Sequence, residues 1–390
     1  MVTAFKNIIV VGGSYVGTST AQQLASVLPN THRILLVEPH THFHHLFAFP
    51  RYAILPSHEH KAFIPYRLFD RDPTSSRQRQ DTVVRAKVLA VHPDRVVLDR
   101  PWQGSGELQF DYLVIATGTR LSAPGTMEVE EKGPSVEYLK RFQSQVQAAS
   151  SVLIIGGGAV GVQMATDVKE LYPAKKVTVV QSRDRVMPKF HPQFHALIAE
   201  RFAELGVELI TGSRVVLPKD GFPSDGSTFG VKLQDGRELQ TQLVILATGQ
   251  TPNNELVATL PGELINPDNG FIRVNPTLQL PGYPHIFAVG DIADTGAHKA
   301  ARPGAAQAAV LTKNVVSMLE GREPSDKITI TPPALHITLG LQKNIVFRNP
   351  PPGACEPSVT WREDGKADMN IDAVWARRGV RVNCVDDYHL

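Results

Sequence analysis

One stretch, residues 7–38, limits what this chain can fold into: NIIVVGGSYVGTSTAQQLASVLPNTHRILLVE. It predicts a strand, a glycine turn, a helix, a second strand and then an acid, which is the order of a dinucleotide-binding βαβ unit. Gly12 permits the sharp turn, and Gly17 lets the helix pack closely, so free N–H groups at the helix start can face a pyrophosphate. Glu38 lies about 20 residues beyond the last glycine, where a carboxylate can accept hydrogen bonds from a ribose. Ser14 replaces the middle glycine, so we expect a slightly looser fit there.

A second copy of this pattern lies at residues 151–183, SVLIIGGGAVGVQMATDVKELYPAKKVTVVQSR. Its turn carries all three fingerprint glycines, which are Gly156, Gly158 and Gly161. Each copy is followed by a further strand that ends in Ala-Thr-Gly, at residues 116–118 and 247–249. Chance is a poor explanation for these features in one order. We therefore predict an α/β chain with two Rossmann-like dinucleotide-binding domains.

The two copies differ where a cofactor ribose would bind. In the second copy the strand at 177–180 is followed by Gln181, Ser182 and Arg183, without an acid. An acid at this place favours an unphosphorylated ribose, whereas a nearby arginine accommodates a 2′-phosphate. Arg183 therefore predicts that NADPH is admitted or that little preference exists. An ordinary surface arginine is the alternative.

A late strand at residues 286–289 ends in Gly290-Asp291 and precedes a long helix rich in alanine. Ligands of open α/β sheets bind at the carboxyl ends of the strands. Asp291 can there take a ribitol hydroxyl or a water bound to a pyrophosphate. A Gly-Asp pair without this context would be an ordinary turn.

Composition excludes several classes of protein. With 40 basic and 38 acidic residues the formal charge is +2, which provides no concentrated basic face for nucleic acid. No apolar run approaches the roughly 18–20 residues needed to cross a bilayer. Cys355 and Cys384 form no CxxC pair, so a disulfide framework, a zinc site and a redox dithiol are disfavoured.

The segment at residues 39–66 contains six histidines, at 40, 42, 44, 45, 58 and 60. Their spacing matches no standard metal motif, so we expect no metal. Phe43, Phe47, Phe49 and Pro50 instead predict a packed loop that lies over a flat aromatic cofactor.

Further elements follow from hydrophobic periodicity. We expect short antiparallel strands within 82–112, helices at 133–150 and 191–205, and a hairpin near Asp235-Gly236. Residues 323–390 carry no glycine fingerprint and predict a small C-terminal α+β segment, with two strands in ALHITLGLQKNIVF.

The order of these motifs resembles the flavoproteins with two dinucleotide-binding domains, of the pyridine nucleotide-disulfide oxidoreductase type. Within that superfamily the chain is similar to the apoptosis-inducing-factor-like branch and its ferroptosis-suppressor NAD(P)H:quinone oxidoreductases. Besides the second glycine turn, the likeness rests on FHHLFAFPR (43–51), KAFIPY (61–66), LVILATG (243–249) and IFAVGDIAD (286–294).

The resemblance implies a glutathione-reductase-like fold: an FAD-binding domain at 1–122 and 250–322, an NAD(P)H-binding domain at 123–249 and a C-terminal interface domain at 323–390. It implies hydride transfer from NADH or NADPH to flavin N5, then electron delivery to a quinone or similar small organic acceptor. The residues implied for FAD are Gly12, Gly13, Ser14, Gly17, Glu38, Arg51, Ala116, Thr117, Gly118, Gly290, Asp291 and Lys299. Those implied for NAD(P)H are Gly156, Gly158, Ala159, Val160, Gly161, Arg183 and Gly249. Lys299 is also a candidate for polarising the flavin, with a solvated lysine as the alternative.

Three residues depart from this branch: Ser14 for glycine, Gln163 where glutamate is frequent, and Val2 in place of a lipidation signal. The last favours a second hypothesis, in which the acceptor is a biosynthetic intermediate or a ferredoxin-type protein. A third hypothesis is a non-catalytic, flavin-containing cell-death effector that binds protein partners. We expect a cytoplasmic protein, with peripheral membrane contact and a homodimer left open.

Overall fold

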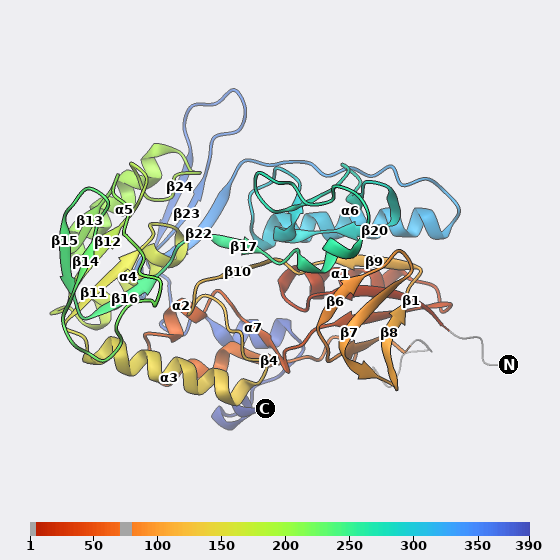
Figure 1. Cartoon of the computed structure of the whole chain (residues 1–390), viewed down its shortest axis with the longest axis horizontal. Coiled ribbons are helices and arrows are strands. Elements are labelled where there is room, and N and C mark those ends of the chain that lie inside the picture. The colour runs from red at the N-terminus through yellow and green to blue at the C-terminus, as the bar shows by residue number, and fades with distance from the viewer. Residues whose placement is uncertain (1–4, 71–79) are drawn as a thin grey trace.

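The computed structural model describes residues 5–70 and 80–390, so Val2 lies outside the described residues. Two sheets, the first mainly and the second wholly parallel, form separate halves of the molecule (Figure 1). The first has the order β19-β20-β9-β1-β2-β5 and the second β13-β12-β11-β16. The predicted α/β fold class is thereby confirmed.

The first sheet combines strands from the beginning of the chain with strands that return far along it. In sheet order its strands are β19 (Gln279–Leu280), β20 (Tyr283–Ala288), β9 (Tyr112–Ile115), β1 (Lys6–Val11), β2 (His32–Val37) and β5 (Thr82–Val84). All its neighbours are parallel except β19 and β20. Helices α1 (Tyr15–Val27) and α6 (Ala301–Leu319) contact each other, and their apolar side chains share a core with β1, β2, β9 and β20.

The second sheet repeats the plan on a smaller scale. Its strands are β13 (Val207–Ile210), β12 (Lys176–Val180), β11 (Ser151–Ile155) and β16 (Leu243–Leu246), all of them parallel. Its helices are α3 (Lys132–Ala148), α4 (Ala159–Leu171) and α5 (Pro192–Leu205). The predicted hairpin is formed by β14 (Phe229–Lys232) and β15 (Glu238–Thr241).

Two short strands join the halves. Each Ala-Thr-Gly turn leads into one of them, β10 (Thr119–Leu121) and β17 (Gln250–Pro252), which pair antiparallel between the two sheets (Figure 1). Gly118 and Gly249 turn the chain with φ of +63° and +60°. The internal repeat therefore extends from the glycine turns to the connection between the halves.

Smaller elements complete the first half. Of the antiparallel strands expected within 82–112, three form: β6 (Val88–Val91), β7 (Arg95–Trp102) and β8 (Ser105–Gln109). The expectation was wrong for β5, which pairs parallel with β2 at the edge of the first sheet. The packed segment after β2 holds β3 (His42–His44), α2 (Phe49–Tyr52), η1 (Glu59–Ala62) and β4 (Phe63–Pro65). The remaining short elements are η2 (Glu255–Thr259), β18 (Ile272–Arg273), η3 (Gly290–Ile292) and β21 (Ala293–Asp294).

The C-terminal segment packs against both halves. The two predicted strands, β22 (Ala334–Thr338) and β23 (Asn344–Arg348), are joined by β24 (Ser358–Arg362), which periodicity did not predict. Helix α7 (Ile371–Arg377) and η4 (Val385–His389) follow. Side chains of β22 and β23 share a core with α4 and α5, whereas α7 shares one with β3 and β4.

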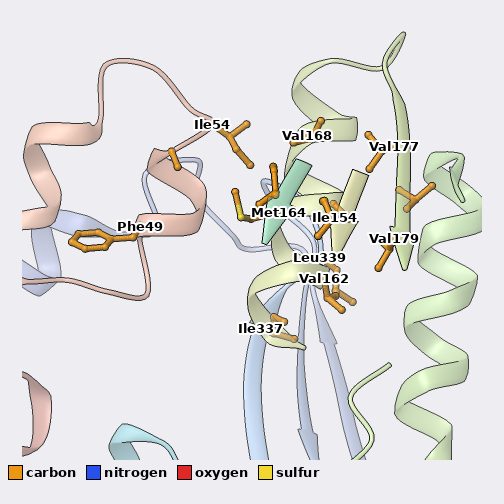
Figure 2. Close-up of a cluster of buried hydrophobic side chains, with 14 of the residues drawn as sticks. Phe49, Ile54, Ile154, Val162, Met164, Val168, Val177, Val179, Ile337 and Leu339 are labelled. Carbon is orange, nitrogen blue, oxygen red and sulfur yellow. The ribbon is translucent and has the colours of Figure 1, made fainter. Parts of the chain in front are cut away.

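A large apolar core crosses from one half to the other. Figure 2 shows Met164 and Val162 of α4 between the strands of the second sheet and side chains from two other segments. One of these is Ile54, just after α2, and the other is the pair Ile337 and Leu339 near the end of β22. Because one cluster includes residues from the first half, the second half and the C-terminal segment, burial of apolar surface sets the relative placement of these three parts.

Candidate functional site

The first sheet gathers the predicted residues at one edge. Val11, at the end of β1, pairs with Val37 of β2 and with Ile115 of β9. Ala288, at the end of β20, pairs with Ile115 as well. Because these strand ends are in register, the residues that follow each of them meet at a single edge: Gly12 to Ser14, Glu38, Ala116 to Gly118, and Gly290-Asp291.

Two glycines in the first turn have no room for a side chain. Gly12 has φ of +104°, and a Cβ on it would lie 2.5 Å from the Ala116 carbonyl oxygen. A Cβ on Gly17 would lie 1.7 Å from the Gly12 oxygen, so helix α1 packs against the turn itself. Ser14 differs, because its φ of −83° and ψ of −161° are open to any residue. The serine is therefore accommodated without backbone strain.

The start of α1 has donors and no internal acceptor. The side chain of Ser14, the N-cap residue, makes no capping hydrogen bond, and the first turn holds no acid. Helix α4 begins in the same way after Gly158. Unpaired N–H groups at a helix start suit an anionic group such as a pyrophosphate. Both turns therefore fit a bound dinucleotide.

Glu38 lies at the bottom of the first turn and is buried. Its Oε2 accepts a hydrogen bond of 2.6 Å from the Gly13 N–H, and its Oε1 is in close contact with Nδ1 of His40. Oε1 also accepts from the His40 backbone N–H at 3.0 Å, so about one further lone pair of this carboxylate stays available for a ribose hydroxyl. Burial lowers the pKa of His40, but the hydrogen bond and charge of Glu38 outweigh it, so the pKa is raised.

Other groups of this edge were not expected from the sequence. The Tyr66 hydroxyl donates to the Gly13 carbonyl at 2.9 Å, and Gln307 of α6 accepts from the Gly290 N–H at 2.7 Å. Tyr66 ends the KAFIPY segment and Gln307 lies within α6, but the approach of either side chain to this edge depends on tertiary packing, so the sequence did not indicate these contacts. His40 is different, since its position two residues after Glu38 was a usable signal.

Asp291, which follows β20, is influenced by the positive charge of Lys299. Burial raises the pKa of Asp291, and the charge of Lys299 opposes that shift. Burial also lowers the pKa of Lys299, against Asp291 and Asp294. The Lys299 ammonium contacts the Ala293 carbonyl and lies 4.1 Å from the centre of the Phe271 ring. It is thus held in place by the chain and is not a freely solvated lysine.

The second sheet repeats the arrangement of the first. Ile155 pairs with Val180 and with Leu246, so Gly156, Gln181 and Ala247 follow in register. Gly156 has φ of +117°, and a Cβ there would lie 2.2 Å from the Ala247 oxygen. Gly161, Ala159 and Val160 form the first turn of α4, and a Cβ on Gly161 would lie 2.0 Å from the Gly156 oxygen. Gly158 meets open space.

Gln181 occupies the position that Glu38 has in the first half. Its Oε1 accepts from the Gly157 N–H at 3.2 Å, as Glu38 accepts from Gly13, and its Nε2 donates to the Arg185 carbonyl at 3.1 Å. The sequence placed Gln181 at the end of the strand but did not indicate its hydrogen bond with Gly157. A neutral amide therefore replaces the carboxylate, and Arg183 lies exposed two residues beyond it.

Arg51 was expected to bind FAD, but its side chain contacts helix α4 and the C-terminal segment. Its side chain is fully buried, and Nε donates to Asp167 Oδ2 of helix α4 at 2.6 Å. Its remaining nitrogens donate to the carbonyls of Gly340, at 2.8 Å, and Ala367, at 3.4 Å. The guanidinium is thus consumed in contacts between the two halves and the C-terminal segment. This placement does not support the expectation that Arg51 holds FAD, because the side chain is fully buried and each of its three nitrogens already donates to a protein oxygen.

Sequence comparison finds one family across most of the chain. Residues 6–312 match the family described as pyridine nucleotide-disulphide oxidoreductase. The chain belongs to this family. It is therefore an oxidoreductase that uses FAD and NAD(P)H, as predicted.

Full-length relatives agree with this family assignment. The chain is 36% identical to Fe-regulated protein 8 of Mycosarcoma maydis, over 96% of this chain and 95% of the relative. It is 28% identical to apoptosis-inducing factor homolog B of Dictyostelium discoideum, over 90% and 91%. It is 30% identical to ferroptosis suppressor protein 1 of Taeniopygia guttata, over 86% of each chain. The resemblance stated from the motifs is thus confirmed.

The same fold is found among solved structures. A sulfide:quinone oxidoreductase from Aquifex aeolicus superposes with a TM-score of 0.73 at 19% identity, covering 97% of this chain and 93% of the other.

Within residues 5–70 and 80–390 no helix is long and apolar enough to cross a membrane. The same residues contain no group of three or more His, Cys, Asp or Glu side chains that could hold a metal ion.

Proposed function

We propose that this oxidoreductase takes a hydride from NAD(P)H through FAD and delivers the electrons to a quinone or a similar small organic acceptor. Bound FAD supplies the redox chemistry, because it accepts a hydride from a nicotinamide and passes electrons onward. The chain's own residues bind and orient the two nucleotides. The domain boundaries proposed from the sequence, at 122/123, 249/250 and 322/323, assign one nucleotide to each half.

FAD is proposed to lie along the edge of the first sheet. The N–H groups at the start of α1, after Gly12 to Ser14, would hold the pyrophosphate, and Glu38 the adenosine ribose. Ala116 to Gly118 and Gly290 would approach through their backbone, and Asp291 would take the ribityl side. Lys299, whose ammonium contacts the Ala293 carbonyl and whose charge opposes the raised pKa of Asp291, would add positive charge near the flavin.

NAD(P)H is proposed to bind the corresponding edge of the second sheet. Gly156, Gly158 and the first turn of α4, with Ala159, Val160 and Gly161, would hold its pyrophosphate. Gly249 would approach from the second Ala-Thr-Gly turn. Paired strands β10 and β17 join the two edges, which supports a direct transfer between the nucleotides.

One observation carries the assignment of a dissociable acceptor. The chain has two cysteines, and both Cys355 and Cys384 are exposed, free thiols. A disulfide relay needs two thiols at bonding distance beside the flavin. With no such pair in 39–66, electrons must leave the flavin for a molecule that comes and goes.

The test is an anaerobic titration followed by an acceptor screen. The purified protein is expected to be yellow, and NADH or NADPH should bleach the flavin band within seconds. Reoxidation is then measured with a water-soluble quinone, a ferredoxin-type protein and oxygen. Rapid reoxidation by the quinone supports the proposal, whereas bleaching without it removes the quinone assignment and leaves the flavin chemistry. A colourless protein would overturn both.

Arg183 gives a separate prediction on the nucleotide. If the exposed guanidinium binds a 2′-phosphate, Arg183→Ala should raise the KM for NADPH about tenfold and leave that for NADH nearly unchanged. Arg237→Ala, at an exposed arginine paired with Asp235 in the hairpin, is the control. Equal effects on both nucleotides would reject the role of Arg183 in binding the phosphate.

We propose a cytoplasmic protein that touches membranes peripherally, which cell fractionation tests, and a homodimer, which sedimentation velocity tests.

A further inference from the structure

The C-terminal helix α7 is built into the first half of the molecule. Trp375 is fully buried, and its Nε1 donates to the Lys61 carbonyl at 2.9 Å. Ile371 and Val374 share a core with Phe43 and with Ile64 of β4. The end of α7 is therefore held at a defined place beside the segment that follows the first glycine turn.

This anchoring brings one cation to the start of α1. Arg378 follows α7 directly, and its Nη1 donates to Oγ1 of Thr18 at 2.7 Å. Thr18 Oγ1 in turn donates to the carbonyl of Ser14 at 2.8 Å. The guanidinium lies 3.7 Å from the centre of the Phe43 ring and 5.6 Å from that of Tyr15. Because Thr18 lies three residues after Tyr15, the first residue of α1, Arg378 contacts the first turn of the helix whose N–H groups are uncapped.

The surroundings of Arg378 leave its charge unbalanced. Across residues 5–70 and 80–390 no carboxylate forms an ion pair with the half-buried Arg378. Burial lowers the pKa of its guanidinium, Tyr15 and Tyr66 oppose that shift, and Arg377 adds to it. A guanidinium has five N–H donors, and within the described part of the chain one of those of Arg378 reaches a protein acceptor. Partial burial of a cation without a counter-ion is unfavourable. The contacts with Phe43 and Tyr15 offset this cost only in part.

We propose that Arg378 is the counter-charge for the FAD pyrophosphate and that the C-terminal segment thereby retains the cofactor. This inference rests on the proposed binding of FAD at the first glycine turn. The pyrophosphate is anionic, the first turn of α1 holds no acid, and Arg378 brings a positive charge and four spare donors beside it. The segment most distant in sequence from the fingerprint then completes the same site.

A purely structural role is the competing explanation, because Arg378 also covers Phe43. Three full-length variants separate the two. Arg378→Met keeps the apolar stem and removes the charge, and Arg378→Lys keeps the charge and removes the planar group. Arg377→Met removes a charge from the exposed neighbouring residue and is the matched control.

The measurement is the rate of FAD release from each holoprotein after dilution. Release is monitored as the recovery of flavin fluorescence, at several salt concentrations. Arg378→Met should release FAD about tenfold faster or more than the unmodified protein, since hydrogen bonds to charged groups are among the stronger ones. Arg378→Lys and Arg377→Met should stay within about threefold. Salt should accelerate release from the unmodified protein and have a smaller effect on Arg378→Met.

The release rates decide whether Arg378 is the counter-charge for the FAD pyrophosphate. Release at the unmodified rate by Arg378→Met, or equally fast release by the Met and Lys variants, overturns the counter-charge role and leaves the proposed function intact. If Arg378→Met does not fold, release from the unmodified protein that is independent of salt still overturns it. An unmodified protein that carries no FAD overturns the proposed function as well.

Discussion

The buried pair of Arg51 and Asp167 provides the sharpest test of how the molecule is held together. Both side chains are fully buried, and Nε and Oδ2 lie 2.6 Å apart. The guanidinium also donates to the carbonyls of Gly340 and Ala367. Replacing Arg51 with methionine therefore removes one group that joins the first half, helix α4 and the C-terminal segment.

The expected loss is large because the partner cannot move into water. Removing one member of a buried ion pair costs about 3–5 kcal/mol, and Arg51→Met should lower the free energy of unfolding by that amount. The other oxygen of Asp167, Oδ1, already lacks a partner within the described residues. In Arg51→Met/Asp167→Leu no charge remains buried, so at least half of the lost stability should return.

The loss should also depend on pH. Burial raises the pKa of the Asp167 carboxyl to about 6, against the opposing charge of Arg51. Without Arg51 that pKa rises further above the unfolded value of about 3.9. A carboxyl with a raised pKa stabilises the fold when protonated, and this contribution is lost as pH rises through the folded pKa. The variant should therefore be weaker at pH 8 than at pH 6.

Urea unfolding of the full chain, followed by circular dichroism at both pH values, measures these differences. Arg237→Met is the matched control, because its pair with Asp235 is exposed and should contribute less than about 1 kcal/mol. A loss below about 1 kcal/mol for Arg51→Met, or a double variant no more stable than the single one, would refute the reasoning.

Two further predictions concern the cofactor edges. Gly161→Ala places a Cβ 2.0 Å from the Gly156 oxygen and should lower the free energy of unfolding by about 1–3 kcal/mol. In Gly158→Ala the new Cβ meets open space, so the free energy of unfolding should change by less than about 0.5 kcal/mol. Thermal melts compare the two variants, and equal melting points would contradict the packing argument. The raised pKa of His40 means that its pair with Glu38 stabilises the fold fully below the unfolded pKa of about 6.5 and is lost as pH rises through the folded value. His40→Asn should abolish that fall in stability between pH 6 and 8, and an unchanged pH profile would exclude the pair as its source.

Much of this fold was predictable because its signals are local. A buried strand, a glycine turn and a helix lie within one short stretch, and the pattern occurs twice, at residues 7–38 and 151–183. The helices α3 and α5 and the hairpin near Asp235 also followed from periodicity. In contrast, β24 and α7 were not predicted, because exposed positions of β24 and the short length of α7 leave weak periodic signals.

The sequence alone determined the two nucleotide-binding units, their family and the strand ends that form each edge. Tertiary structure decided which side chains support those edges. Arg51, which a motif suggested for the cofactor, pairs with a residue 116 positions away, and Arg378 reaches Thr18 across 360 positions. Such contacts leave no periodic trace in either segment, because they arise only when separate apolar faces are buried together. The fingerprint therefore locates each site, and distant segments complete it.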